Sequence, residues 1–183
     1  MCYLSKPQQY LLEVLRETGA LRRSQATVLL QRQFDSSPHA IAVMLRQLRT
    51  IGQLREQDGV LTLAGRSASP SVLLAVDLAL ALFPKTAPIL FRLYPPFVLA
   101  AYDEARNMTF RALAVPAGQE QACCLHAEQV MQSDPRVLLA LLLEHRAQCK
   151  LICLPVSCLL AYPNADGELK ITKYAKGAIQ NDI

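Results

Sequence analysis

The chain has 183 residues, of which 52% are hydrophobic and 19% are charged, and its formal net charge is +4. This length holds one medium-sized domain or two small ones, and the composition excludes an intrinsically disordered chain. Residues 1–66 carry nine Lys and Arg against five Asp and Glu, whereas residues 67–183 carry ten of each, a distribution typical of a nucleic-acid-binding domain joined to a neutral one.

A first helix is predicted over residues 7–17, and Gly19 is suited to end it. Ala20 and Leu21 then fit a very short strand. Ser24 provides the N-cap of a second helix that reaches Phe34. The apolar residues of both helices recur at helical spacing and predict their buried faces, which consist of Leu11, Leu12, Val14, Leu15, Ala26, Leu29, Leu30 and Phe34.

A third helix is expected from Ser37 to Ile51, because Ser36 and Ser37 offer hydroxyl N-caps directly before Pro38. Its apolar residues share one face and predict a core stripe of Ile41, Met44, Leu45, Leu48 and Ile51. The opposite face is basic and rich in amides, and it contains no acidic residue. This helix therefore has one face for the core and one face for a polar partner.

A β-hairpin is predicted directly after the third helix, which Gly52 is suited to end. Residues 53–57 and 60–63 flank the dipeptide Asp58-Gly59, and this dipeptide favours the positive φ angles of a two-residue hairpin turn. Gly65 closes the unit. The predicted order in residues 1–66 is therefore helix, short strand, helix, helix and hairpin.

This order, with its tight connection between the second and third helices, resembles the winged-helix domain, the helix-turn-helix variant common in bacterial transcription regulators. The resemblance implies that the helix from Ser37 to Ile51 lies in the DNA major groove. It also implies that the hairpin tip from Arg55 to Asp58 contacts the phosphate backbone or the minor groove. The residues implied to contact DNA are Ser24, Gln25, His39, Arg46, Gln47, Arg49, Thr50 and Arg55.

Two other interpretations of this polar face remain open. The same residues would also form an ordinary solvated helix surface. Winged-helix domains also serve as protein-interaction or dimerisation modules, and Glu56 and Asp58 place negative charge in the hairpin. A fold by itself does not decide between DNA and a protein as the partner.

Residues 66–70 form a predicted linker and the start of a new helix, with Ser69 as N-cap and Pro70 after it. We therefore place a boundary between a winged-helix domain of residues 1–66 and a second domain of residues 67–183. The elements predicted for the second domain are a helix at 72–83, strands at 88–93, 97–102 and 108–115, helices at 119–131 and 134–145, a strand at 150–154, and a hairpin of 158–162 with 168–174. They indicate an α/β domain with a mixed sheet, and α+β organisation for the whole chain.

The order of elements in the second domain resembles the restriction-endonuclease-like fold. Enzymes with that fold hold a metal ion through an acidic residue near the end of the second core strand and an acid-x-lysine set on the third. Asp103 occupies the first position, but the stretch Thr109-Phe110-Arg111 and its neighbours provide no carboxylate on the third strand. The resemblance therefore implies a nuclease-like domain without catalytic residues, in which Asp103 is a turn residue.

The cysteines do not indicate a metal site. Cys123 and Cys124 are close to His126 in sequence, but Cys123 shares a helical face with apolar residues and is better explained as core. A zinc site would need further ligands from Cys149, Cys153 and Cys158, and no C-x-x-C pair is present. The sequence also contains no Gly-rich phosphate-binding loop, G-x-S-x-G or H-E-x-x-H motif. We therefore expect no cofactor, no bound metal and no catalytic residue.

We expect a cytoplasmic protein. The N-terminus shows no long apolar run followed by a small-residue cleavage site, as a signal peptide would have. The longest apolar runs, near residues 72–83 and 137–143, are too short to span a bilayer. Six cysteines without an export signal are more typical of reduced thiols than of a disulfide framework.

A winged helix followed by a degenerate nuclease-like domain also resembles replication-relaxation-type proteins of bacterial mobile elements, such as plasmids and conjugative transposons. The resemblance implies a non-catalytic DNA-binding protein that acts at a replication or transfer origin or regulates the genes of the element. Its expected partners are double-stranded DNA, a second copy of the chain, and a relaxase or replication protein, with no membrane. The alternative is a protein-interaction or dimerisation module whose C-terminal domain senses a ligand.

Overall fold

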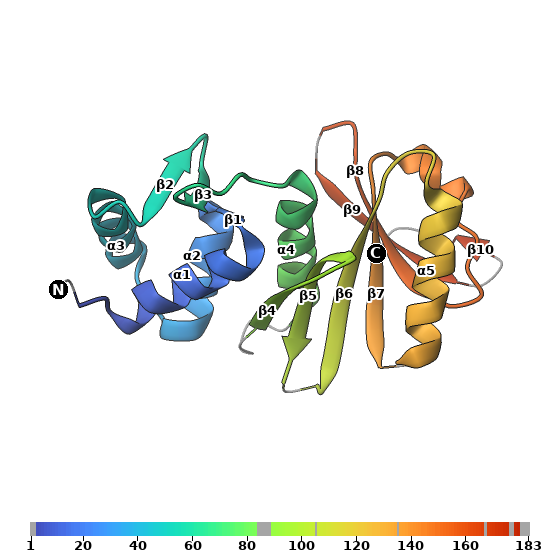
Figure 1. Ribbon diagram of the computed structural model, residues 1–183, viewed down its shortest axis with the longest axis horizontal. Coiled ribbons are helices and arrows are strands. Elements are labelled where there is room, and N and C mark those ends of the chain that lie inside the picture. The colour runs from blue at the N-terminus through green and yellow to red at the C-terminus, as the bar shows by residue number, and fades with distance from the viewer. Residues whose placement is uncertain are drawn as a thin grey trace. The chain divides into compact units, whose positions relative to one another are not determined.

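The computed structural model describes residues 3–83, 89–104, 106–134, 136–166, 168–175 and 178–179. These residues form a mixed α and β protein, in agreement with the predicted fold class. The chain divides into two compact units, Met1–Leu93 and Tyr94–Ile183 (Figure 1).

The N-terminal unit begins with three helices and a small sheet. Its elements are α1 (Lys6–Thr18), β1 (Ala20–Arg22), α2 (Arg23–Phe34), α3 (Pro38–Thr50), β2 (Leu54–Gln57), β3 (Val60–Leu63) and α4 (Pro70–Leu82). Strand β3 lies between β1 and β2 and is antiparallel to both. The predicted order of helix, short strand, helix, helix and hairpin is therefore confirmed.

Short-range contacts explain where these elements begin and turn. The Ser5 hydroxyl caps α1, and the Gln8 side chain accepts in return from the Ser5 backbone N–H at 2.8 Å. The Ser37 hydroxyl caps α3 by accepting from a backbone N–H three residues further on at 3.2 Å. In the hairpin turn, Asp58 and Gly59 both have positive φ, at 50° and 75°, as the sequence predicts.

An apolar core fills the N-terminal unit. Its fully buried side chains include Leu11, Leu15, Leu21, Leu29, Leu30, Leu45, Leu48 and Leu61. One predicted core residue is wrong, because Ile51 is 41% exposed. Helix α3 ends at Thr50 and Ile51 is its C-cap, so this side chain leaves the buried stripe that the preceding turns follow.

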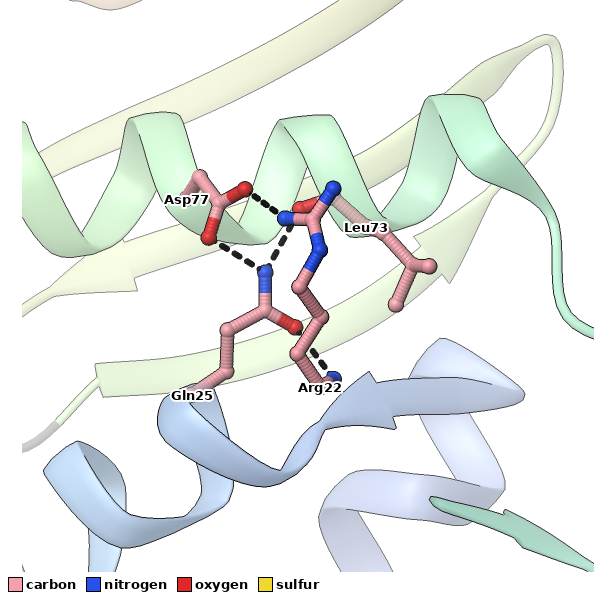
Figure 2. A network of polar contacts seen from close by, with 4 residues as sticks. All are labelled: Arg22, Gln25, Leu73 and Asp77. Atoms are coloured by element: carbon pink, nitrogen blue, oxygen red, sulfur yellow. Dashed lines mark hydrogen bonds and ion pairs between the residues drawn. The ribbon is translucent and has the colours of Figure 1, made fainter. Parts of the chain in front are cut away.

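The structure corrects the predicted domain boundary at residues 66–70, because α4 packs against α2 and β1. Gln25 of α2 is 2% exposed, and its Nε2 donates to the Leu73 carbonyl at 2.7 Å and to Asp77 Oδ1 at 2.6 Å (Figure 2). Asp77 also pairs with Arg22. A buried amide on α2 thus requires α4 beside it, and the compact unit continues to Leu93.

The division between the units falls within β4 (Ile89–Tyr94). The later elements are β5 (Phe97–Asp103), β6 (Met108–Val115), α5 (Glu120–Ser133), β7 (Val137–Leu143), the 3₁₀ helix η1 (Arg146–Lys150), β8 (Cys158–Pro163), β9 (Leu169–Ala175) and β10 (Ala178–Ile179). Among the described residues, β4 to β10 follow one another in the sheet in chain order. The β6–β7 and β7–β8 pairs are parallel, whereas β5–β6 and β8–β9 are antiparallel, so the sheet is mixed as predicted.

Two predicted elements of the second unit are wrong. Residues 137–143, predicted as part of a helix, form β7, a parallel strand that is buried along nearly its whole length. An apolar run of this kind has neither the helical nor the alternating period, so periodicity does not separate the two structures. Residues 150–154 are not a strand: η1 ends at Lys150, and the Leu154 N–H donates at 3.1 Å to a side chain, the hydroxyl of Tyr174 on β9, and not to the backbone of a strand.

We predict that Gln25→Ala lowers the free energy of unfolding of the full chain by about 1–3 kcal/mol, because its buried partners lose their hydrogen bonds. Chemical denaturation followed by circular dichroism measures this change. Gln33→Ala is the matched control, since Gln33 is an exposed glutamine of the same helix. It should change the stability by less than about 0.5 kcal/mol. Equal effects of the two substitutions would contradict the role given to the buried amide.

Candidate nucleic-acid interface

Helix α3 separates its buried side from a polar side. Ile41, Met44, Leu45 and Leu48 are buried, which leaves the remaining side of the helix outward. The predicted site residues on this outward side are all exposed: His39, Arg46, Gln47, Arg49 and Thr50. The structure therefore brings five of the eight predicted residues onto one helix face that carries no carboxylate.

One carboxylate from the hairpin joins this face to the start of α2. Glu56 Oε2 accepts from Arg49 Nη1 at 2.8 Å, and Glu56 Oε1 accepts from Arg23 Nη1 at 3.1 Å. The Glu56 side chain is only 12% exposed, whereas both arginines are about half exposed. We call this arrangement of Arg23, Glu56 and Arg49 the Glu56 bridge. Each partly exposed pair contributes about 0.2–1 kcal/mol, so the bridge acts mainly on the orientation and charge of the arginines.

Two other predicted residues use their side chains within the protein. Gln47 Oε1 accepts from Gln8 Nε2 at 3.0 Å, which links α3 to α1. The Thr50 hydroxyl donates to the Arg46 carbonyl at 3.0 Å. The Gln47 side chain is exposed, and its NH₂ group donates to no other residue in the described ranges. Gln47 is therefore held in place while it keeps donors for a ligand.

Arg46 and Arg55 carry the positive charge that the Glu56 bridge leaves unpaired. Both are exposed, and neither forms an ion pair with any residue in the described ranges. Arg46 also borders a shallow hollow of about 390 Å³. The other residues that line this hollow are Tyr3, Leu4, Gln8, Gln47, Thr50 and Ile51. Arg46 is therefore the exposed cation of α3 that has no ion pair within the described ranges.

The structure contradicts the prediction that Gln25 contacts phosphate. Its amide is buried and bonded to Arg22, Leu73 and Asp77, so it is not available to a ligand. Ser24 is exposed at the start of α2, as its predicted role requires. Arg23, which is not among the predicted site residues, donates its backbone N–H to the Gly59 carbonyl at 2.8 Å and places α2 against the hairpin turn. Arg23 lies beside the hairpin because β1, which directly precedes it, pairs with β3. The sequence does not specify this pairing, so it offered no signal that Arg23 belongs to the site.

The described residues of the second unit do not form the set of acidic residues with which a nuclease-like domain would hold a metal ion. Asp103, with 0% exposure, accepts at Oδ1 from the Arg106 backbone N–H at 3.4 Å, and its Oδ2 lies 3.7 Å from Arg106 Nε. Asp103 is therefore the last residue of β5, paired with Met108, and not a turn residue as interpreted from the sequence; its side chain accepts from the backbone of the turn that follows. On β6, the Arg111 guanidinium lies 5.0 Å from the ring centre of Tyr94 and 3.8 Å from Asp134. Strand β6 itself contains no carboxylate.

The cysteines of the second unit are free thiols, and most are buried. Burial raises the pKa of the Cys158 thiol to about 12, and it also raises the pKa of Cys124. Within the described ranges, no group of three His, Cys, Asp or Glu side chains is arranged to hold a metal ion. Cys2 lies outside the described residues.

Comparison of the chain with protein-family models, curated proteins and solved structures found no match. None of the helices in the described part of the chain combines the length and the apolar character of a membrane span.

Asp103→Ala should lower the free energy of unfolding by about 1–3 kcal/mol, since it removes a buried carboxylate that accepts from the turn backbone. Thermal and urea denaturation of the full chain measure the loss. Glu104→Ala removes an exposed carboxylate one position away and should be nearly neutral. If Asp103→Ala proved as stable as the control, the structural role of Asp103 would be wrong.

Proposed function

We propose that the chain is a non-catalytic DNA-binding protein whose N-terminal unit is a winged-helix domain. The observation that carries this proposal is the exposed, carboxylate-free face of α3, with Arg46 unpaired among the described residues and the β2–β3 hairpin attached through the Glu56 bridge. Helix α3 has 13 residues and is about 20 Å long, which suits insertion into a major groove. Arg46, Gln47 and Arg49 then face base edges and phosphates.

The hairpin and the start of α2 supply the flanking contacts in this proposal. Arg55 is exposed on β2, next to the positive-φ turn, and reaches the phosphate backbone or the minor groove. Ser24 and the backbone N–H groups of α2 that follow Arg23 bind a phosphate, as helix N-termini do. His39 and Thr50 lie at the two ends of the α3 face. In this proposal, the contacts from the hairpin, α2 and the ends of α3 are made to the same DNA duplex.

The second unit supports a role without catalysis. The antiparallel strands β5 and β6 are followed by α5 and the parallel strand β7, an order that resembles the restriction-endonuclease-like fold, and β6 lacks carboxylates. We propose that this unit contributes assembly, as a homodimer or with a relaxase or replication protein. The biological setting that we propose is replication, transfer or transcriptional regulation of a bacterial mobile element.

A second candidate function is a protein-interaction or dimerisation module with a ligand-sensing C-terminal domain. The Glu56 bridge favours it, because one carboxylate offsets two of the cations beside α3. The buried Gln25 also removes one expected phosphate ligand. The two functions differ in partner, so a DNA titration separates them.

Arg46→Ala should weaken binding to duplex DNA by about 5- to 150-fold, because a good arginine contact to DNA is worth about 1–3 kcal/mol. Fluorescence anisotropy with a labelled 20-base-pair duplex at low salt measures the affinity. Arg16→Ala is the matched control: it also removes one exposed arginine, and Arg16 lies near the C-terminal end of α1, beside Glu13 and Glu17. If the wild-type chain binds no duplex at low salt, the α3 face belongs to a protein partner.

The purified chain should not cleave plasmid DNA in the presence of magnesium or manganese, because the third core strand offers no carboxylate to hold the ion. Agarose gel electrophoresis after overnight incubation checks this expectation. Metal-dependent cleavage that disappears in Asp103→Ala, in protein shown to be folded, would contradict the non-catalytic assignment.

A further inference from the structure

Glu56 occupies an unusual place for a charged residue of a hairpin. Its neighbours on β2, Arg55 and Gln57, are exposed, whereas Glu56 lies on the same side of the strand as the buried Leu54. Its carboxylate therefore points towards the helices and not into solvent. There it meets Arg23 from α2 and Arg49 from α3.

The geometry of the bridge leaves both arginines able to bind phosphate. Each guanidinium gives one nitrogen, Nη1, to a different oxygen of Glu56. A guanidinium has five N–H donors, so most donors of Arg23 and Arg49 remain for another acceptor. Because both side chains are about half exposed, these donors reach solvent. Glu56 thus fixes the direction of two cations and offsets part of their charge.

We propose that Glu56 is a positioning residue that limits non-specific DNA binding and so determines specificity, an inference that rests on the proposed function. Attraction between arginines and phosphates is independent of sequence and supplies essentially all non-specific affinity. By holding Arg23 and Arg49, Glu56 lowers that attraction. Arg46, with no ion pair in the described ranges, then makes a larger share of the contacts, and contacts to base edges carry the sequence information.

The test is the salt dependence of binding to a mixed-sequence 20-base-pair duplex, measured with the full chain. Glu56→Gln removes the charge that restrains both arginines. Glu13→Gln is the matched control, because it changes the net charge by the same amount at an exposed position of α1. Glu56→Asp keeps the negative charge, and Glu56→Gln with Arg49→Gln removes one of the released cations. Circular dichroism melts establish that each variant is folded.

Each phosphate neutralised adds about 0.9 to the steepness of log K against log salt concentration. Glu56→Gln should therefore steepen the slope by about 1–2 and tighten binding at 0.1 M salt by roughly 10- to 60-fold. Adding Arg49→Gln should reverse about one unit of that change, and Glu56→Asp should stay within about 0.5 of the wild-type slope. Glu13→Gln should change the slope by less than about 0.5.

Two different failures are distinguishable. If the wild-type chain binds the duplex but Glu56→Gln has the slope of Glu13→Gln, the inference about Glu56 is overturned and the proposed function stands. If neither the wild type nor any variant binds duplex DNA at low salt, the proposed function fails and the inference fails with it.

Discussion

The N-terminal unit depends on the buried amide of Gln25. A buried amide needs hydrogen-bond partners, and Gln25 finds them on the N–H of Arg22 and on Leu73 and Asp77 of α4. Helix α2 is fixed to α4 a second time where Arg32 Nη2 donates to the Leu80 carbonyl at 2.7 Å. These contacts turn one side of α2 inward. They explain why the compact unit extends beyond the hairpin and why Gln25 does not face a ligand.

A second buried glutamine has a similar role in the other unit. Gln148 of η1 is 1% exposed, and its Nε2 donates to the Val115 carbonyl at 2.9 Å and to Glu120 Oε1 at 3.0 Å. Its Oε1 accepts from the Glu144 N–H at 2.7 Å. One side chain thus satisfies groups at the ends of β6, β7 and α5. The Glu120 carboxylate accepts hydrogen bonds from the Glu120 backbone N–H, from the Gln148 side chain and from the Gly118 N–H. These bonds lower the pKa of Glu120 and so favour its charged form.

Features with local causes could be predicted from the sequence. Ser37 caps a helix through a contact three residues long, and Asp58-Gly59 defines its own turn, so α3 and the hairpin were predicted within a few residues. Contacts between distant residues could not be predicted. The partners of Gln25 on α4 lie 48 and 52 positions away, and Arg23 lies 33 positions from Glu56. Because these long-range contacts could not be predicted, the sequence did not indicate the end of the N-terminal unit, the burial of Gln25 or the Glu56 bridge.

The strand β7 shows a different limit of sequence reasoning. Its residues Val137–Leu143 are apolar throughout, because a parallel strand inside a sheet is covered on both sides. The same run, preceded by Asp134, also fits a capped helix. Only its pairing with β6 and β8 shows that it is a strand and not a helix. The exposure of the polar residues of α3 was easier to predict than this element, since the spacing of apolar residues along an amphipathic helix defines its outward face.

Amide chemical-shift mapping determines whether the outward face of α3 binds duplex DNA, as we propose. Two-dimensional NMR spectra of the isotope-labelled full chain would be recorded during titration with a 16-base-pair duplex at low salt. We predict that the largest shifts occur in α3 and the β2–β3 hairpin, with smaller shifts at the start of α2. Shifts confined to residues 94–183, or none at saturating DNA, would contradict it.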